Sequence, residues 1–412
     1  MTSKLKSWIL ALLPIIGIYS LAGANISNVW LILIVIYGIY RSAKKNGRIY
    51  LGKIDKILLL FWPYTIFVSI INCLFSGNVD LRDITVKYVH VTCFILIIAV
   101  FRTITFDKNI DTEPFIKVAL VSSCFLIVQF ILYNFLGIKL YGVSEAFRTN
   151  ITEDITRPSS FFVEPAHFCR YIMLPLFILL FRSSSPKKMN KALLISVAVV
   201  LSKSSIGYIG LSAIWLAWIF IEVSKRRMSH NRFAKSLILI TLAIAVCIWV
   251  DSRFDILSFA IEHISELNMK QISSGNLRVF RGFWIWREED LLHQIFGVGM
   301  ANVNNYLIKN GIRTIFDGQL ELGCEYMSAV SYVLVMNGIV GLSIFFSALF
   351  CLFHKSENTE KVLIFVFVLL MLSNEEFQSV DFMNIWIYLL VEYTSRGKQK
   401  ETPKIIYNAC SS

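Results

Sequence analysis

Three short segments of the chain combine charged and polar side chains in patterns that could do chemistry. The first runs from Arg157 to Arg170 and reads RPSSFFVEPAHFCR. Pro165 can begin a helix, because the missing N–H of proline costs nothing in the first helical turn. Glu164 would then stand at the helix N-terminus, and His167 and Arg170 would follow it along the same face. The pattern predicts a carboxylate, an imidazole and a guanidinium side by side.

Two interpretations of this first segment are open. Arg170 lies inside an apolar run, where an ionisable group is costly and usually has a function. This favours a reactive or binding site. The alternative is structural, because a negative charge such as Glu164 is favourable at any helix N-terminus.

The second segment, Leu201–Gly207, reads LSKSSIG and interrupts the apolar stretch 192–222. That stretch is too long for one membrane span and just long enough for two short ones. Lys203 would lie in the turn between the two, with its charge near the membrane surface. A binding role competes here with snorkelling, in which a lysine only extends its ammonium group to water.

The third segment, Asn276–Trp286, reads NLRVFRGFWIW and leads to GVGMAN at Gly297–Asn302. Arg278 and Arg281 would share one helical face, and a guanidinium group can bind two phosphate oxygens at once. The alternative is an amphipathic interfacial helix whose basic residues face lipid headgroups. The Gly-x-Gly pattern by itself indicates only a turn.

The composition shows which elements must position these residues. Apolar residues make up 56% of the 412, charged residues 17%, and the mean hydropathy is +0.63. These values exclude a soluble enzyme, a disordered chain and a coiled coil. The net charge of +12 then belongs to the cytoplasmic side of a membrane protein, and no nucleic acid is expected as a partner.

Other classes of site are missing from the sequence. It contains no GxxxxGK[ST] or HExxH motif, and its eight cysteines are scattered without metal spacing. Neither a metal nor another cofactor is expected, and nothing indicates a structural disulfide.

We expect an all-α integral membrane protein, a single polytopic domain over residues 1–412 with about twelve transmembrane helices. Runs without barrel-type alternation must be helices, because lipid offers no partner for backbone groups. The expected spans are 6–22, 27–40, 56–75, 86–101, 115–136, 166–181, 191–202, 205–222, 236–250, 326–353, 362–373 and 382–394. A secretory signal peptide over residues 4–24 is the alternative to a first transmembrane hairpin, which we prefer because a second apolar run follows at once.

The loop charges predict the orientation. With the N-terminus in the cytoplasm, the cytoplasmic segments hold 26 of the 40 Lys and Arg residues and the outer segments hold 14. The positive-inside rule therefore places both termini in the cytoplasm. Two outer segments are too long for simple turns: 137–165, and 251–325, in which short helices are expected and Ile256–Leu267 would lie along the membrane surface.

The chain resembles the bacterial O-antigen and capsular polysaccharide repeat-unit polymerases, which are relatives of the O-antigen ligases. The resemblance is strongest over 150–345 and rests on the order of four loose motifs. These are an outer arginine with SSFFVEP, a Ser-basic-Ser turn between two helices, an arginine-rich loop ending in FGVGMAN, and MNGIVGL in the tenth span.

The resemblance implies a metal-independent, integral-membrane glycosyltransferase in the bacterial inner membrane. It would transfer the growing glycan from undecaprenyl pyrophosphate to a hydroxyl of the next lipid-linked repeat on the outer leaflet. Membrane lipid is an expected partner, and a chain-length regulator protein is an optional one.

The resemblance also assigns roles to residues. Arg157, Arg278 and Arg281 match the family's key arginines. Lys203 stands where the family often has arginine, and its ammonium group keeps the charge but cannot bind two phosphate oxygens as a guanidinium group does. We expect Arg157, Arg170, Lys203, Arg278 and Arg281 to bind the pyrophosphate. Fixed cations of this kind stabilise the charge that develops on a leaving pyrophosphate.

The catalytic set expected from this chemistry is Glu164, His167 and Arg281. For the base that takes the acceptor's proton, Glu164 is the first candidate, followed by His167 and Glu325.

Two alternatives remain open at this point. An O-antigen ligase would be expected to show a His-Asn pair shortly before NGIVGL, where this chain has Glu325-Tyr-Met-Ser328. A flippase or other transporter of lipid-linked oligosaccharides would be expected to show inverted repeats and charges at mid-membrane. We find no repeat in the sequence, and the charges fall near the outer surface.

Overall fold

The computed structural model describes residues 3–17, 19–21, 24–44, 51–76, 81–105, 110–142, 157–224, 274–300, 302–318, 320–372 and 377–401. The expected span at 236–250 and the expected surface helix Ile256–Leu267 lie outside these residues. So does the middle of the expected outer segment 137–165.

The described chain is helical, as expected. Its longer helices are α1 (Ser3–Ile16), α2 (Ile26–Lys44), α3 (Lys53–Ser76), α4 (Leu81–Thr105), α5 (Glu113–Leu136), α6 (Pro165–Phe177), α7 (Lys188–Leu201), α8 (Ser205–Ser224), α15 (Ala329–Lys355), α16 (Asn358–Met371) and α17 (Val380–Glu401). A short π-helix, η2 (Ile178–Arg182), continues α6, and two-residue strands, β1 (Ser20–Leu21) and β2 (Ala24–Asn25), pair between α1 and α2.

Five of these helices are long and apolar enough to cross a membrane. They cover Lys53–Leu74, Glu113–Leu136, Pro165–Arg182, Ser205–Glu222 and Ala329–Lys355. The protein therefore has the features of an α-helical membrane protein. The described part of the long expected loop contains four short helices: α11 (Ser274–Val279), α12 (Arg281–Glu288), α13 (Leu291–Phe296) and α14 (Val303–Lys309).

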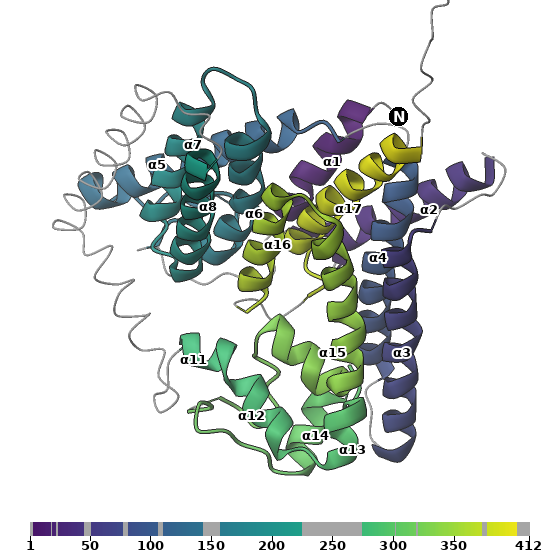
Figure 1. The fold of residues 1–412 in the computed structure, drawn as a ribbon. Helices are drawn as coiled ribbons and strands as arrows, with labels where there is room; N and C mark the ends of the chain where they lie inside the picture. The colour runs from purple at the N-terminus through teal and green to yellow at the C-terminus, as the bar shows by residue number, and fades with distance from the viewer. Residues whose placement is uncertain are drawn as a thin grey trace, which may run out of the picture.

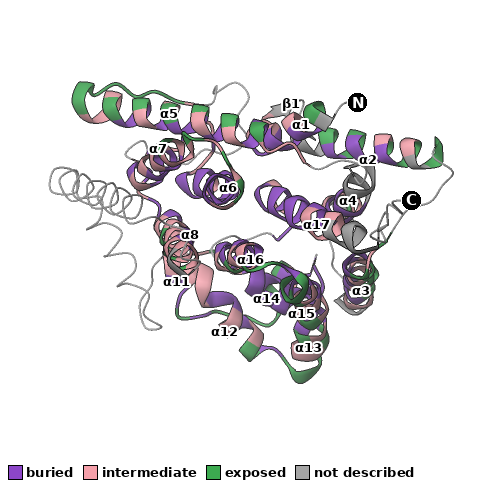
Figure 2. Ribbon diagram, turned by 45° about the horizontal axis from the view of Figure 1, so that its top comes forward, coloured by how far each residue is buried: buried purple, intermediate pink, exposed green. Residues whose placement is uncertain are grey.

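Helix α6 lies at the centre of the molecule. Of the residues in its apolar window, 83% are buried, the largest share among the five candidate spans. It packs against α5, α7, α8, α16 and α17, and Figure 2 shows it almost entirely in the colour of buried residues. The buried charge of Arg170 on α6 must therefore find its partner within the protein.

Other helices lie farther out on two sides of α6. In Figure 2, α5, α1 and α2 lie along one edge of the molecule, and α3 and α15 lie on the opposite side of α6 from α5. Helices α3 and α15 pack against each other, and in Figure 1 α12, α13 and α14 gather beside them at the bottom of the view.

Helix α15 is broken at Gly338, and the short helices dock on this break. Gly338 has φ 62° and ψ −171°, a conformation that is essentially open only to glycine. The carbonyls of Val335 and Met336 before the break accept hydrogen bonds from the N–H groups of Val298 (3.1 Å) and Gly299 (2.8 Å). Carbonyls at a helix break lose their partners within the helix, so the GVG segment supplies new ones. The two glycine motifs noted in the sequence are thus in contact.

Candidate functional site

Helix α6 begins as the sequence predicts. Glu164 is its N-cap residue with extended backbone (φ −133°, ψ 154°), and Pro165 occupies the first turn. The Glu164 side chain forms no capping hydrogen bond to the backbone. Its carboxylate is therefore directed at other partners, and this end of α6 is called the Glu164 end below.

One turn into α6, two side chains converge on a carboxylate from the last helix. Asp381 Oδ2 lies 3.0 Å from His167 Nδ1 and 3.3 Å from Arg170 Nε. The side chains of Arg170 and Asp381 are 3% and 6% exposed, whereas that of His167 is 39% exposed. Asp381 thus neutralises a buried guanidinium and at the same time holds the imidazole with its other nitrogen, Nε2, away from the carboxylate.

The arginine-rich segment reaches the same place. Arg278 Nη2 lies 3.8 Å from Glu164 Oε2, and Arg278 Nε donates a hydrogen bond to the hydroxyl of Tyr326. The guanidinium also lies over the Tyr326 ring, with its central carbon 5.2 Å from the ring centroid. About a quarter of each charged side chain is exposed, so Arg278 and Glu164 both remain accessible to a ligand.

The turn between α7 and α8 completes this end of the molecule. Cys169 Sγ of α6 lies 3.2 Å from Ser202 Oγ, and a Cβ on Gly207 would lie only 2.5 Å from that sulfur. The turn therefore packs tightly against α6. It holds Lys203 in a left-handed conformation (φ 52°) beside Ser202. Arg157 is also close, since its charge acts on the Cys169 side chain.

The expected residues thus divide into two groups. Five of them gather at the Glu164 end: Arg157, Glu164, His167, Arg170 and Arg278. Lys203 lies in the turn that packs against the same helix. Arg281 differs, because its side chain is 2% exposed and is paired with Asp317, while its Nη1 donates to the Tyr326 carbonyl at 3.0 Å. This placement fits a structural role that holds α12 to the segment before α15.

Glu325, the third candidate for the base, also has a structural partner. Its carboxylate lies 2.6 Å from Lys87 Nζ of α4 and accepts a hydrogen bond from the Tyr332 hydroxyl at 3.2 Å. Both oxygens of this carboxylate are thus already engaged by partners within the protein. The geometry therefore leaves Glu164 and His167 as the candidates.

A second polar cluster lies beyond the Glu164 end, around α13. A cavity of about 440 Å³ is lined there by Trp284, Glu288, Asp290, Tyr306, Asn310, Gly311, Ile312, Arg313 and Ile315. Beside it, burial raises the pKa of the Glu289 carboxyl to about 9, and the Asp290 charge adds to this. Hydrogen bonds from His293 and Leu292 instead hold the pKa of Asp290 below its usual value. The site residues expected from the sequence do not line this cavity.

Sequence reasoning missed Asp381, Tyr326 and Asp317. Asp381 left one usable signal, since it is an acid at the head of an apolar run, and the buried Arg170 required an acid as partner. Tyr326 and Asp317 left none, because neither stands out among the other tyrosines and acids.

The arrangement can bind an anion and accept a proton. Arg278, Lys203 and Arg157 provide positive charge, and His167 with Asp381 has the geometry of a histidine whose tautomer is fixed by a carboxylate. Among the residues that the structure describes, no three His, Cys, Asp or Glu side chains form a group that could hold a metal ion. In comparisons with known proteins, no family model matches the chain, and no curated protein matches it.

Proposed function

We propose that the protein is a glycosyltransferase that polymerises lipid-linked polysaccharide repeat units. One observation carries the proposal. Residues from three separate parts of the chain meet at the Glu164 end and place a His–Asp pair beside arginine side chains: the starts of α6 and α17, and the last turn of α11. The turn before α8, which carries Lys203, packs against the same helix α6. A transfer from a pyrophosphate to a hydroxyl needs these two functions, a base and an anion site.

The proposed reaction joins the donor glycan to an acceptor hydroxyl. The acceptor oxygen bonds to the anomeric carbon, and the bond from that carbon to the pyrophosphate oxygen breaks. The acceptor's proton passes to the base, and the negative charge passes to the leaving lipid pyrophosphate. Arg278, Arg157 and Lys203 stabilise this charge as it develops.

The contacts favour His167 over Glu164 as the base. Asp381 fixes the Nδ1 side of His167, so Nε2 can take up a proton, and the imidazolium that forms is stabilised by the carboxylate. The Glu164 carboxylate instead forms an ion pair with Arg278 at 3.8 Å. Glu164 then serves to orient Arg278 toward the pyrophosphate.

The membrane arrangement belongs to the same proposal. We place about twelve crossings in the bacterial inner membrane, with both termini in the cytoplasm and the Glu164 end at the outer leaflet. The loop charges support this orientation. It would bring the site to the level of the pyrophosphate of an undecaprenyl-linked oligosaccharide.

A transporter of the same lipid-linked oligosaccharide is the second candidate, because broken helices such as α15 are typical of transporters. In transporters, carbonyls freed by the break coordinate the substrate or its coupling ion. Here Val298 and Gly299 donate to those carbonyls, and the charged cluster lies elsewhere. The contacts at the break therefore favour an enzyme.

The proposal can be tested with the purified full-length chain in detergent. The donor and acceptor are lipid-linked repeats extracted from membranes of the producing cells, and elongation is followed by gel analysis of glycan length. We expect elongation by the wild-type protein, about 10²–10⁴-fold slower elongation by His167→Gln, and a smaller loss for Glu164→Gln. Glu288→Gln is the matched control, since Glu288 is an exposed carboxylate outside the Glu164 end.

The outcomes separate the alternatives. No elongation by the wild-type protein, combined with movement of the lipid-linked repeat across reconstituted vesicles, would favour the transporter. Wild-type rates for His167→Gln with a large loss for Glu164→Gln would return the role of base to Glu164. Equal losses of elongation rate in all three variants would mean that the active site does not lie at the Glu164 end.

A further inference from the structure

The segment 291–300 lies unusually deep along helix α3. The candidate span of α3 covers Lys53–Leu74, and Tyr64 stands at its middle. The hydroxyl of Tyr64 donates a hydrogen bond to the carbonyl of Phe296 at 3.1 Å. His293 Nε2 contacts Asn72 Oδ1, near the end of the same span, also at 3.1 Å. The two residues of α3 that α13 contacts, Asn72 and Tyr64, are eight positions apart, which is about 12 Å along the helix at 1.5 Å per residue.

Helix α15 gives the same depth independently. Its candidate span covers Ala329–Lys355, and the break at Gly338 lies well inside it. A Cβ on Gly338 would lie 2.2 Å from the carbonyl oxygen of Ile295, and a Cβ on Gly297 would lie 2.4 Å from the backbone nitrogen of Asn337. The end of α13 is therefore in van der Waals contact with the interior of two candidate spans.

Backbone groups in this segment find partners inside the protein. Besides Val298 and Gly299, which donate to α15, the carbonyl of Gly297 accepts from Asn72 Nδ2 at 3.1 Å. The N–H of Met300 donates to Ser69 Oγ at 2.8 Å, and its carbonyl accepts from the Tyr332 hydroxyl at 3.3 Å. Irregular backbone at membrane depth is tolerated only when its polar groups are satisfied within the protein. This segment meets that condition.

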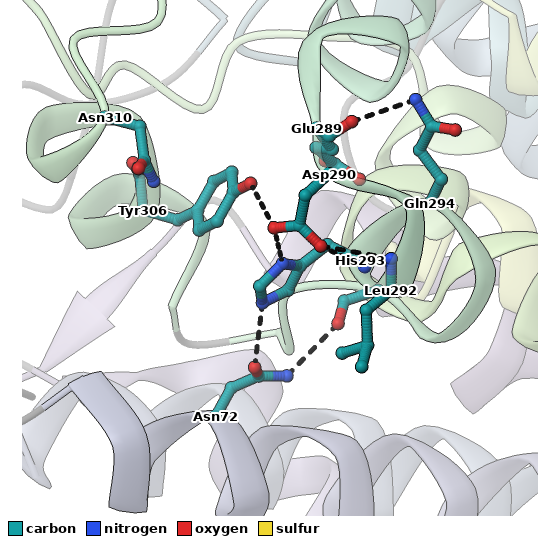
Figure 3. Close-up of polar contacts among 9 residues, drawn as sticks. Asn72, Glu289, Asp290, Leu292, His293, Gln294, Tyr306 and Asn310 are labelled. Carbon is teal, nitrogen blue, oxygen red and sulfur yellow. Dashed lines mark hydrogen bonds and ion pairs between the residues drawn. The ribbon is translucent and has the colours of Figure 1, made fainter.

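A polar anchor, formed by Asn72, Asp290 and His293, fixes the N-terminal end of α13 (Figure 3). Asn72 Nδ2 donates to the carbonyls of Val68 and Gly297, so its Oδ1 faces His293 Nε2. The other ring nitrogen of His293 contacts the carboxylate of Asp290. Both ring nitrogens of His293 thus face oxygen atoms. Asp290 is exposed, and an exposed carboxylate belongs at the water-facing rim of a membrane segment.

The face of α13 that points away from the protein is apolar. Leu291 is 72% exposed, Leu292 62% and Phe296 47%. The neighbouring helix α3 also exposes apolar side chains over its candidate span, among them Leu74 and Ile70. The exposed apolar surface of a membrane span faces acyl chains, and the surface of α13 continues it.

We infer that residues 291–300 form a re-entrant element: they enter the membrane beside α3 and α15, and Leu291, Leu292 and Phe296 contact lipid acyl chains. The occupant of this face is lipid, because the face continues the exposed surface of a candidate span and because backbone groups of residues 296–300 are hydrogen-bonded within the protein at that depth. The inference is independent of glycosyl transfer. Part of the expected outer loop 251–325 would then lie within the bilayer.

Photo-crosslinking in lipid tests this inference on the full chain. Leu292 is replaced by p-benzoyl-phenylalanine, the protein is placed in nanodiscs of dioleoyl phosphatidylcholine, and adducts are measured by intact-protein mass spectrometry after illumination. Leu74 of α3, 77% exposed, serves as the matched apolar position, and Lys309 of α14 as the matched exposed polar position. All three side chains are exposed, so the bulky replacement fits without repacking.

We expect a mass gain of one lipid at positions 292 and 74 with similar yield, and at least a five-fold lower yield at 309. A lipid adduct at 74 but none at 292 overturns the inference, because α13 would then lie in water. A protein–protein adduct at 292 also overturns it and identifies a second copy of the chain as the occupant. Absence of lipid adducts at all three positions contradicts the membrane placement of α3 as well as that of α13.

Discussion

The carboxylate of Asp381 lies 3.3 Å from Nε of Arg170, and the two residues are 211 positions apart in the chain. Both side chains are almost completely buried. Neither charge could remain in the protein interior alone, because an unpaired buried ion is strongly destabilising. The pair joins the central helix α6 to the last helix α17, and the same carboxylate positions His167.

The first prediction concerns this shared carboxylate. Asp381→Asn leaves Arg170 without a counter-charge, so we expect a loss of about 3–5 kcal/mol in the free energy of unfolding. His167→Gln leaves the Arg170 pair intact and should change stability by less than about 1 kcal/mol. Thermal unfolding in detergent measures both. Similar losses for the two variants would show that Asp381 supports His167 rather than Arg170.

The second prediction concerns Arg281, which is buried against Asp317. Arg281→Ala and Asp317→Ala should each lower stability by about 3–5 kcal/mol, because each leaves one buried charge unpaired. The double variant should be less destabilised than the sum of the two losses. A double-mutant cycle by thermal unfolding gives the coupling. Additive losses, together with abolished elongation and normal stability in Arg281→Lys, would instead favour phosphate binding by Arg281.

The third prediction concerns the break in α15. Gly338→Ala places a Cβ 2.2 Å from the carbonyl oxygen of Ile295 and forces a conformation reserved for glycine. Gly311→Ala is the matched control, since Gly311 also has a positive φ (60°) but nothing within 4 Å of its Cβ. We expect a loss of about 1–2 kcal/mol for Gly311→Ala from backbone strain alone and a clearly larger loss for Gly338→Ala. Equal losses would mean that α13 does not dock at the break.

The fourth prediction concerns Glu289, whose pKa rises from 4.5 to about 9 through burial. Between these pH values the folded state keeps a proton that the unfolded chain has released, so stability falls as pH rises, by at most about 1.4 kcal/mol per pH unit. In Glu289→Gln, the unfolding temperature should depend less on pH between pH 5 and 8, and it should be higher than that of the wild type at pH 8. Glu288→Gln, at the exposed neighbour, should keep the wild-type slope. An unchanged slope in Glu289→Gln would mean that Glu289 is ionised when folded.

The sequence alone determined the helical class, the positions of most helices and the start of the candidate site. Apolar runs of this length can only be helices in lipid, and each expected span within the described residues contains a helix. Pro165 begins α6 because proline is suited to a first helical turn, and this places Glu164, His167 and Arg170 as the spacing predicts. These are local properties, which neighbouring residues decide.

Only the tertiary structure decided the partners. Asp381 meets Arg170, Arg278 meets Glu164, and Arg281 is paired with Asp317, although Arg278 and Arg281 look equivalent in sequence. The role of the GVG and NGIVGL motifs also depends on their contact. The GVG segment supplies N–H groups to the carbonyls that the break in α15 leaves without helical partners. Ion pairs and helix breaks depend on which distant segments are packed side by side, and helical periodicity within one segment carries no information about the charge that a second segment brings to it.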